Sequence, residues 1–320
     1  MTPETGKKRT LDAFFAPTPS KKVRVSETSA PPTTHEAYPF PISQLPTELV
    51  DTLGFSPENE GEVINNQPHL DLLYFKPYIP KSITSELFTF LRSELPFYRV
   101  KYTIKRYGVS TDINTPRYTT VFGIDNTTRF DNDGNPIDAK TERLLPSNHF
   151  RCKPRPIPEC LEALRRVTEG TTGQTFNFCL VNYYATGDDS ISYHSDDERF
   201  LGTNPAIASF SLGEPRDFLL KHKPPATGKS EGKQAVSKPL KFTLGAGDMI
   251  LMKGETQANW LHSIPKRKGI EVGKGRINIT FRKAMVKEGT ENYYNYNVGN
   301  GPVHKWDSSR KEMVPWTASS

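Results

Sequence analysis

The stretch SYHSDDERF, residues 192–200, places His194 two positions before Asp196. In an extended strand, residues i and i+2 point to the same face, so both side chains would aim at one point. A histidine and a carboxylate on one face can be two ligands of a metal ion. The same short pattern is common in solvated surface turns. This stretch alone therefore leaves both a metal site and a turn open.

A redox-active iron site needs a third ligand, because its usual donor set is two histidines and one carboxylate with open positions. His262, in NWLHSIP, follows the predicted strand region GDMILMKG and lies 68 residues after His194. It is well placed to reach the same point from another strand. We take His194, Asp196 and His262 as candidate iron ligands.

The segment RINITFR, residues 276–282, alternates two kinds of side chain. The even positions carry Arg276, Asn278, Thr280 and Arg282, and the odd positions carry Ile277, Ile279 and Phe281. A polar strand face can simply be solvated. If it faces inward, however, its two guanidinium groups need anions, and a dicarboxylate supplies two.

A second strand, FNFCLVNYY, shows a related alternation. One face carries Phe176, Phe178, Leu180, Asn182 and Tyr184. Its apolar side thus ends in an amide and a phenol, as expected where a core gives way to a polar pocket.

Two helices precede most of the strands. SITSELFTFLRSEL, residues 82–95, and IPECLEALRRVTEG, residues 157–170, have apolar residues at helical spacing, and Gly170 is expected to end the second helix. The later segments PAIASFSLG, RDFLLKHK, KFTLGAGDMILMKG and RINITFRKA have the period of strands. Several short strands separated by turn residues predict a sandwich or jelly roll, with the helices covering one sheet.

The H-x-D motif, the distant histidine and R-x-N-x-T-x-R, in this order, resemble the AlkB family of iron- and 2-oxoglutarate-dependent dioxygenases. The resemblance runs from about residue 70 to 286, within an expected domain of residues 68–286. Its segments look like those of the nuclear branch that repairs alkylated duplex DNA. The implied fold is α+β and mainly β: a double-stranded β-helix (jelly roll) core flanked by N-terminal helices.

The resemblance also implies roles for single residues. The ligands of Fe(II) would be His194, Asp196 and His262. The residues that bind 2-oxoglutarate would be Asn182, Tyr184, Arg276, Asn278 and Arg282. Of these, Arg276 would pair with the distal carboxylate and Arg282 would lie near the metal-proximal one. Asp197 would approach the damaged base as a catalytic residue, and O₂ would be the second co-substrate.

Substrate contacts are expected in a nucleotide lid, residues 106–131, which is rich in aromatic, basic and turn-forming residues. Phe130 would stack on the base, although Thr128 stands where the family's relatives carry a tyrosine. Tyr107 would be part of the wedge that fills the gap left by a flipped base. Arg267 and Lys268 would contact phosphates.

Residues 1–40 are rich in Pro, Thr, Ser and Lys and predict a disordered tail. Within this tail, Leu11, Phe14 and Phe15 resemble the sliding-clamp (PCNA) interaction box, although Lys8 replaces its glutamine. The cluster PSKKVRV beyond them is typical of a nuclear-import signal. Residues 41–67 stay unassigned, and residues 287–320 are expected to be an Asn/Tyr-rich tail.

Composition narrows the classes of protein. The chain has 320 residues, a formal net charge of +6 and 35% hydrophobic residues. Its isoelectric point near 9.0 favours a polyanionic partner. Three cysteines without a C-x-x-C pair argue against a disulfide framework or a zinc knuckle. No run of eighteen apolar residues and no secretory leader is recognised, so neither a membrane nor a secreted protein is expected.

The predicted function is oxidative demethylation of N-alkylated bases, such as N1-methyladenine and N3-methylcytosine, in nuclear DNA by a monomer, with duplex favoured. Two alternatives stay open. The same iron chemistry can act on RNA or 5-methylcytosine, or the chain can be a catalytically silent nucleic-acid-binding module. Loss of an iron ligand or a co-substrate arginine would mark the silent module, and none is lost.

Overall fold

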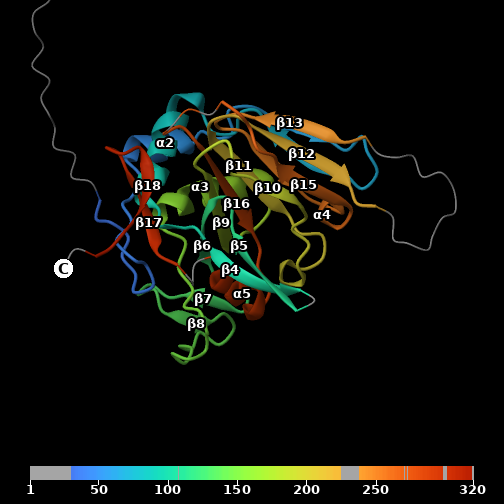
Figure 1. Cartoon of the computed structure of the whole chain (residues 1–320). Coiled ribbons are helices and arrows are strands. Elements are labelled where there is room, and N and C mark those ends of the chain that lie inside the picture. The colour runs from blue at the N-terminus through green and yellow to red at the C-terminus, as the bar shows by residue number, and fades with distance from the viewer. Residues whose placement is uncertain are drawn as a thin grey trace, which may run out of the picture. The chain divides into compact units, whose positions relative to one another are not determined.

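Two antiparallel sheets face each other across the centre of the fold (Figure 1). The computed structural model describes residues 30–106, 108–224, 238–269, 271, 273–297 and 301–318. The larger sheet there has ten strands, in the spatial order β1 (Glu62–Ile64), β2 (Leu72–Phe75), β14 (Met249–Met252), β11 (Ile207–Gly213), β16 (Arg276–Arg282), β9 (Phe178–Tyr184), β6 (Tyr118–Gly123), β3 (Phe97–Tyr98), β17 (Val303–Asp307) and β18 (Glu312–Pro315).

The smaller sheet has four strands in the described residues, in the order β10 (Ile191–His194), β15 (Trp260–Ile264), β12 (Arg216–His222) and β13 (Leu240–Leu244). Two hairpins stand apart from both sheets. They are β4 (Lys101–Arg106) with β5 (Val109–Asn114), and β7 (Thr128–Phe130) with β8 (Pro136–Asp138).

The helices are α1 (Thr47–Leu53), α2 (Lys81–Glu94), α3 (Glu159–Thr172), α4 (Thr256–Asn259) and α5 (Lys287–Asn297), with one 3₁₀ turn, η2 (Arg199–Leu201). Figure 1 shows α2 and α3 on one side of the larger sheet, and β12, β13 and β15 on the other. Among the described helices, none combines the length and apolar character needed to cross a bilayer.

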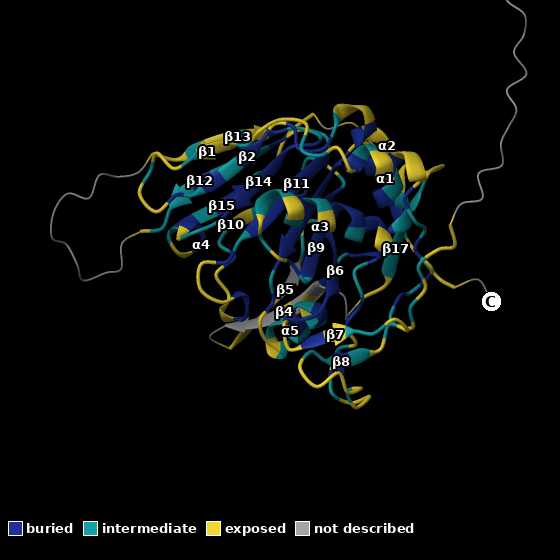
Figure 2. Ribbon diagram, turned by 180° about the vertical axis from the view of Figure 1, so that it is seen from behind, coloured by how far each residue is buried: buried dark blue, intermediate teal, exposed yellow. Residues whose placement is uncertain are grey.

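Strand pleating divides the interior into two cores. The odd residues of β16, Ile277, Ile279 and Phe281, pack with α2 and α3 in the first core. The second core lies between the sheets and joins β9 to β12, β14 and β15. The strands β9, β11 and β16 are buried throughout almost their whole length (Figure 2). The predicted jelly roll with helices on one sheet is therefore confirmed.

Both predicted helices are present, but one boundary was wrong. The helix predicted to stop at Gly170 continues to Thr172 as α3. It ends at Gly173, which has a φ of 66°. Glycine adopts this left-handed conformation without the steric penalty of a Cβ, so Gly173 is the better helix terminator.

The two predicted tails were too long. Residues 1–29, with the clamp-box residues Leu11, Phe14 and Phe15, lie outside the described residues. From Pro31 onward the chain is packed, because Thr33 forms a β-bridge with Ile42 and the ring of Tyr38 is buried in the first core.

At the other end, the segment expected to be an Asn/Tyr-rich tail forms α5, β17 and β18. Its core contacts are made largely by aromatic and hydroxyl side chains, which gave no aliphatic pattern. The unassigned segment 41–67 contains α1 and β1.

Part of the predicted lid was also wrong. Residues 118–123 form β6, a fully buried strand that pairs with β9 inside the larger sheet. A strand held on both edges cannot close over a substrate, so the lid prediction is limited to the hairpins on either side of β6. Tyr107, the predicted wedge residue, lies outside the described residues.

Trp306 of β17 tests whether the C-terminal hairpin is part of the fold. The Arg92 guanidinium carbon lies 3.7 Å from the centroid of its ring, and Trp306 packs against the first core. We expect Trp306→Ala to lower the free energy of unfolding by roughly 2 kcal/mol, below the cost at a fully buried site. Denaturant unfolding measures this change.

Arg310→Ala on the same hairpin is the matched control. Its side chain is exposed and forms only a surface ion pair with Asp307. We expect a change within about 0.5 kcal/mol for this control. Equal, small effects of both substitutions would contradict the assignment of β17 to the folded core.

Candidate iron and 2-oxoglutarate site

The three predicted iron ligands meet between the two sheets. His194 ends β10 and lies directly opposite His262 of β15 in the antiparallel register. Asp196 follows two residues later, and its Oδ2 lies 3.8 Å from His262 Nε2. One potential ligand atom from each side chain lies within 4.8 Å of the others. Strand pairing thus joins two histidines that are 68 residues apart in the sequence.

Both imidazoles are in states that suit a metal. His194 Nδ1 lies 2.9 Å from the Ser192 carbonyl oxygen. A carbonyl can only accept, so Nδ1 carries a hydrogen and Nε2 is the ring nitrogen left to bind a metal. Burial, followed by the nearby His194, lowers the pKa of His262 to about 3. His262 is therefore neutral at physiological pH.

Asp196 is fixed and ionised. Its backbone N–H donates to Gln257 Oε1 of α4 at 2.9 Å, and its Oδ1 lies 3.2 Å from Arg282 Nη2. Burial alone would raise the pKa of Asp196, but the Arg282 guanidinium, and then His262, lower it below its usual value. Two imidazoles and one carboxylate are a donor set that fits Fe(II).

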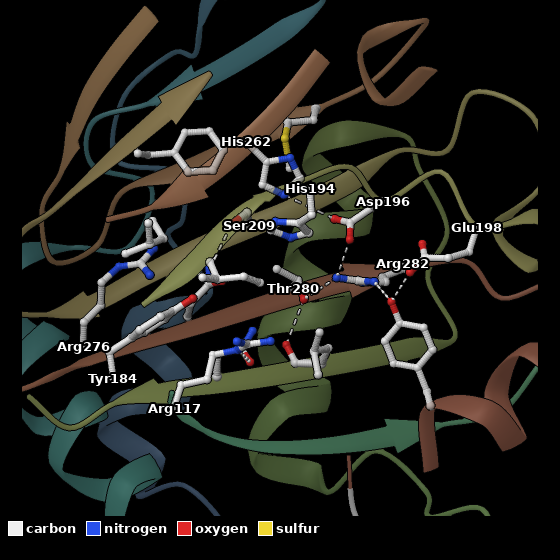
Figure 3. Close-up of a pocket in the computed structure, with 18 of the residues that line it drawn as sticks. Arg117, Tyr184, His194, Asp196, Glu198, Ser209, His262, Arg276, Thr280 and Arg282 are labelled. Carbon is white, nitrogen blue, oxygen red and sulfur yellow. Dashed lines mark hydrogen bonds and ion pairs between the residues drawn. The ribbon is translucent and has the colours of Figure 1, made fainter. Parts of the chain in front are cut away.

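A cavity of about 280 Å³ adjoins these ligands. In Figure 3, His194, Asp196 and His262 point toward one another, and Arg276 and Tyr184 lie on the side away from Asp196, Glu198 and Arg282. Each of the five predicted 2-oxoglutarate contacts lines this cavity: Asn182, Tyr184, Arg276, Asn278 and Arg282. The alternative of a solvated strand face is excluded for Arg276 and Arg282, which are 1% and 3% exposed.

The Arg276 guanidinium has no anionic partner among the described residues. Its Nε and Nη2 donate to Ser211 Oγ at 3.1 and 2.7 Å, while the buried Nη1 has no hydrogen-bond partner. Its guanidinium carbon lies 5.4 Å from the centroid of the Tyr184 ring. Burial lowers the pKa of Arg276 to about 10, so the group stays charged at neutral pH. A buried cation with a free donor fits a carboxylate of a small ligand.

Arg282, unlike Arg276, has a carboxylate partner within the protein. Besides Asp196, it contacts the phenol of Tyr293, to which its Nη1 donates at 2.8 Å, while its buried Nε has no partner. Burial disfavours the charged guanidinium, but the Asp196 carboxylate outweighs burial and raises the pKa of Arg282. Arg282 therefore links the iron ligands to the helix α5.

Two amides complete the cavity wall. Asn278 Nδ2 donates to Ser209 Oγ at 2.9 Å and to the Phe210 carbonyl oxygen at 2.7 Å. Asn182 Oδ1 accepts from Arg117 Nε at 3.0 Å. Their orientations are thus set by neighbouring strands, and their predicted contact with 2-oxoglutarate stays a prediction.

The structure does not bring the predicted catalytic Asp197 into the cavity. Its side chain is exposed, and its Oδ2 accepts from Lys223 Nζ at 2.6 Å. Glu198 lines the cavity instead. The i, i+2 spacing that joins His194 to Asp196 also points to Glu198, so the sequence contained a signal for this cavity residue.

The predicted nucleic-acid contacts lie outside the cavity. Phe130 lines a second cavity, where its ring centroid is 5.9 Å from that of His35. Arg267 and Lys268 are exposed after β15, and Arg267 Nη1 donates to the Pro215 carbonyl oxygen at 2.5 Å. Base stacking by Phe130 gains no support from this arrangement.

Several cavity residues were missed by the sequence reasoning. They are Arg117, Glu198, Ser209, Asn292, Tyr293 and Tyr296. Ser209 had a signal, because β11 alternates serines with apolar residues and pairs with β16. The three α5 residues had none, because their segment showed no apolar period.

A double-stranded β-helix with two histidines and an aspartate meeting in an internal cavity defines the non-haem iron oxygenase class. The sequence profile of the 2OG-Fe(II) oxygenase superfamily matches residues 71–282. The chain therefore belongs to this superfamily and, within it, to the AlkB family. The family uses Fe(II), 2-oxoglutarate and O₂, as predicted from the sequence.

Three relatives illustrate the match. DNA oxidative demethylase ALKBH2 of Homo sapiens is 41% identical over 133 residues, which are 42% of this chain and 49% of that protein. Alpha-ketoglutarate-dependent dioxygenase alkB homolog 3 of Rattus norvegicus is 38% identical over 141 residues, 43% of this chain and 46% of that protein. DNA oxidative demethylase ALKBH2 of Arabidopsis thaliana is 32% identical over 228 residues, 67% of each chain. The chain spans about half the length of the first two.

His194→Ala tests the metal site directly. Loss of one of three ligands should weaken Fe(II) binding by more than the roughly 10–100-fold that loss of a supporting residue costs. Anaerobic calorimetric titration with Fe(II) measures this change.

His222→Ala is the matched control, because its ring packs against Trp260 and does not line the cavity. This control should bind Fe(II) like the unmodified chain. Full Fe(II) affinity of the His194 variant would remove His194 from the metal site.

Proposed function

We propose that this protein is an Fe(II)- and 2-oxoglutarate-dependent dioxygenase that removes N-linked methyl groups from bases in DNA. The observation that carries the proposal is the buried Arg276, whose free Nη1 lies in the same cavity as three convergent iron ligands. A metal site alone needs no second buried cation. A metal site that works with a dicarboxylate needs such a cation to bind the carboxylate that does not reach the metal.

His194, Asp196 and His262 would hold Fe(II). With bound 2-oxoglutarate and O₂, the metal supplies the oxidation in which one oxygen atom enters a methyl C–H bond while 2-oxoglutarate becomes succinate and CO₂. The resulting hydroxymethyl group leaves as formaldehyde, its hydroxyl proton is released, and the ring nitrogen keeps the electron pair of the broken N–C bond. The chain's own task is to orient the reactants and to exclude water.

The two arginines would divide the co-substrate between them. Arg276, at one end of the cavity, would bind the distal carboxylate, and Arg282, beside Asp196, would lie near the carboxylate next to the metal. The remaining predicted contacts, Asn182, Tyr184 and Asn278, would hydrogen-bond the same molecule. The hydrogen bonds of Asn182 to Arg117 and of Asn278 to β11 support fixed orientations for these two amides.

DNA as the substrate is supported by the relatives named as DNA oxidative demethylases and by the basic isoelectric point near 9.0. A base in a duplex must be flipped out to reach an internal cavity, and a lesion lowers the cost of flipping. Glu198 offers a carboxylate to the methylated base, and N1-methyladenine and N3-methylcytosine are cationic. Exposed Arg267 and Lys268 would contact phosphates without reading sequence.

The N-terminal segment suggests where in the cell the protein acts. The segment with Leu11, Phe14 and Phe15 would tether it to the sliding clamp, and the basic cluster PSKKVRV would direct it to the nucleus. We propose that it acts there as a monomer on duplex DNA.

The reaction is tested by measuring formaldehyde and succinate with Fe(II), 2-oxoglutarate and an oligonucleotide that carries one N1-methyladenine. Duplex DNA, the same single strand and the matching RNA are compared. We expect release of both products, highest with the duplex. Succinate without formaldehyde from any of the three would overturn the demethylase proposal, and a preference for RNA would overturn the choice of DNA.

Arg276 should set the affinity for 2-oxoglutarate. We expect Arg276→Gln to raise the KM for 2-oxoglutarate by about 30-fold or more, the equivalent of roughly 2 kcal/mol for losing a buried charge pair. Succinate release against 2-oxoglutarate concentration measures this KM. Arg276→Lys keeps the charge but loses the forked geometry, so its KM should lie between that of the unmodified chain and that of Arg276→Gln. An unchanged KM in Arg276→Gln would exclude the proposed contact.

A further inference from the structure

The helix α5 forms a wall of the cavity. Asn292, Tyr293 and Tyr296 all line the cavity, and positions 292 and 296 lie one helical turn apart on the same face. The helix is the next element after β16, so the strand that carries Arg276 and Arg282 leads into this wall of the cavity.

The rest of the helix is anchored away from the cavity. Tyr294 is buried, and its phenol donates to the Gly123 carbonyl oxygen at 2.8 Å and accepts from the Arg155 backbone N–H at 2.8 Å. Gly289 packs so closely on Phe200 that a Cβ at this position would overlap the ring. The cavity-facing residues of α5 therefore hold fixed positions.

Tyr293 links two charged groups of the cavity. Its phenol donates to Glu198 Oε1 at 2.6 Å and accepts from Arg282 Nη1 at 2.8 Å. Arg282 in turn contacts the iron ligand Asp196 at 3.2 Å. A chain of four polar groups thus runs from the buried metal site to Glu198, which is exposed to solvent.

We propose that α5 is a substrate-recognition element and that Tyr293 is its positioning residue. Tyr293 holds the Glu198 carboxylate where a cationic, N-methylated base enters the cavity, and at the same time fixes Arg282 beside the co-substrate. This inference rests on the proposed function and names the feature of the substrate that is read, its positive charge.

Tyrosine is the side chain that this role requires. A phenol donates and accepts at the same time, so it can bridge a carboxylate and a guanidinium. Phenylalanine would keep the ring packing on Phe178 and Phe200, whose centroids lie 5.6 and 5.2 Å from that of Tyr293. It would leave Arg282 Nη1 without this partner and release Glu198.

The test compares Tyr293→Phe with Tyr294→Phe, its neighbour on the same helix. The first readout is the ratio of kcat/KM for N1-methyladenine, which is cationic, to that for N3-methylthymine, which is neutral, in the same DNA. We expect Tyr293→Phe to lower this ratio by about tenfold, as for loss of a hydrogen bond to a charged group. Tyr294→Phe should lower the thermal stability and leave the ratio unchanged.

The second readout is independent of turnover. Fluorescence anisotropy, without O₂, measures the affinity for a methylated oligonucleotide relative to the unmethylated one. Tyr293→Phe should lose much of this preference. Glu198→Gln should lose it as well, and the double variant should be no worse than Glu198→Gln alone, because Tyr293 acts through Glu198.

The outcomes separate the two proposals. If the unmodified chain releases no formaldehyde from either base, the proposed function fails. If it demethylates and both preferences survive in Tyr293→Phe, only the role of α5 fails. An equal loss of these preferences in Tyr293→Phe and Tyr294→Phe would also contradict the role of Tyr293, because a general weakening of the helix would then explain both results.

Discussion

The alternation of side chains along β16 is the constraint on which the rest of the structure depends. Its odd residues are buried against α2 and α3, so its even residues must face the cavity. A shift of one residue would place two guanidinium groups in an apolar core and three apolar side chains in the cavity. The pairing of β16 with β9 and β11 on its two sides holds the strand in its register.

Charge balance follows from this arrangement. Arg276 and Arg282 share the cavity with a single buried carboxylate, Asp196. Buried cations without matching anions are costly, and a protein keeps them where a ligand supplies the missing charge. Arg282 is paired with the Asp196 carboxylate, whereas Arg276, among the described residues, donates only to the neutral Ser211 hydroxyl and keeps a free Nη1. Under the proposed function, this asymmetry would give the cavity one end for a dicarboxylate and another for the substrate.

Features of the site that depend on the two-residue period of strands and on local motifs could be predicted from the sequence. His194, Asp196 and the two-faced β16 follow from i, i+2 spacing, and His262 from its place after a predicted strand. The structure brings these residues together. Helix α5 could not be predicted in this way, because its buried contacts come from Thr290 and Tyr294 rather than from an aliphatic stripe. The packing of Phe130 against His35 could not be predicted for another reason: His35 lies in a segment that composition marked as disordered.

The most direct test of the central claim is a crystal structure of the chain grown without O₂, with Mn(II) in place of Fe(II) and with 2-oxoglutarate. Anomalous scattering would locate the metal. We predict one metal ion bound by His194, Asp196 and His262, and a carboxylate of 2-oxoglutarate on Arg276 Nη1. A metal bound elsewhere, or 2-oxoglutarate bound without contact to Arg276, would contradict the assignment of this cavity.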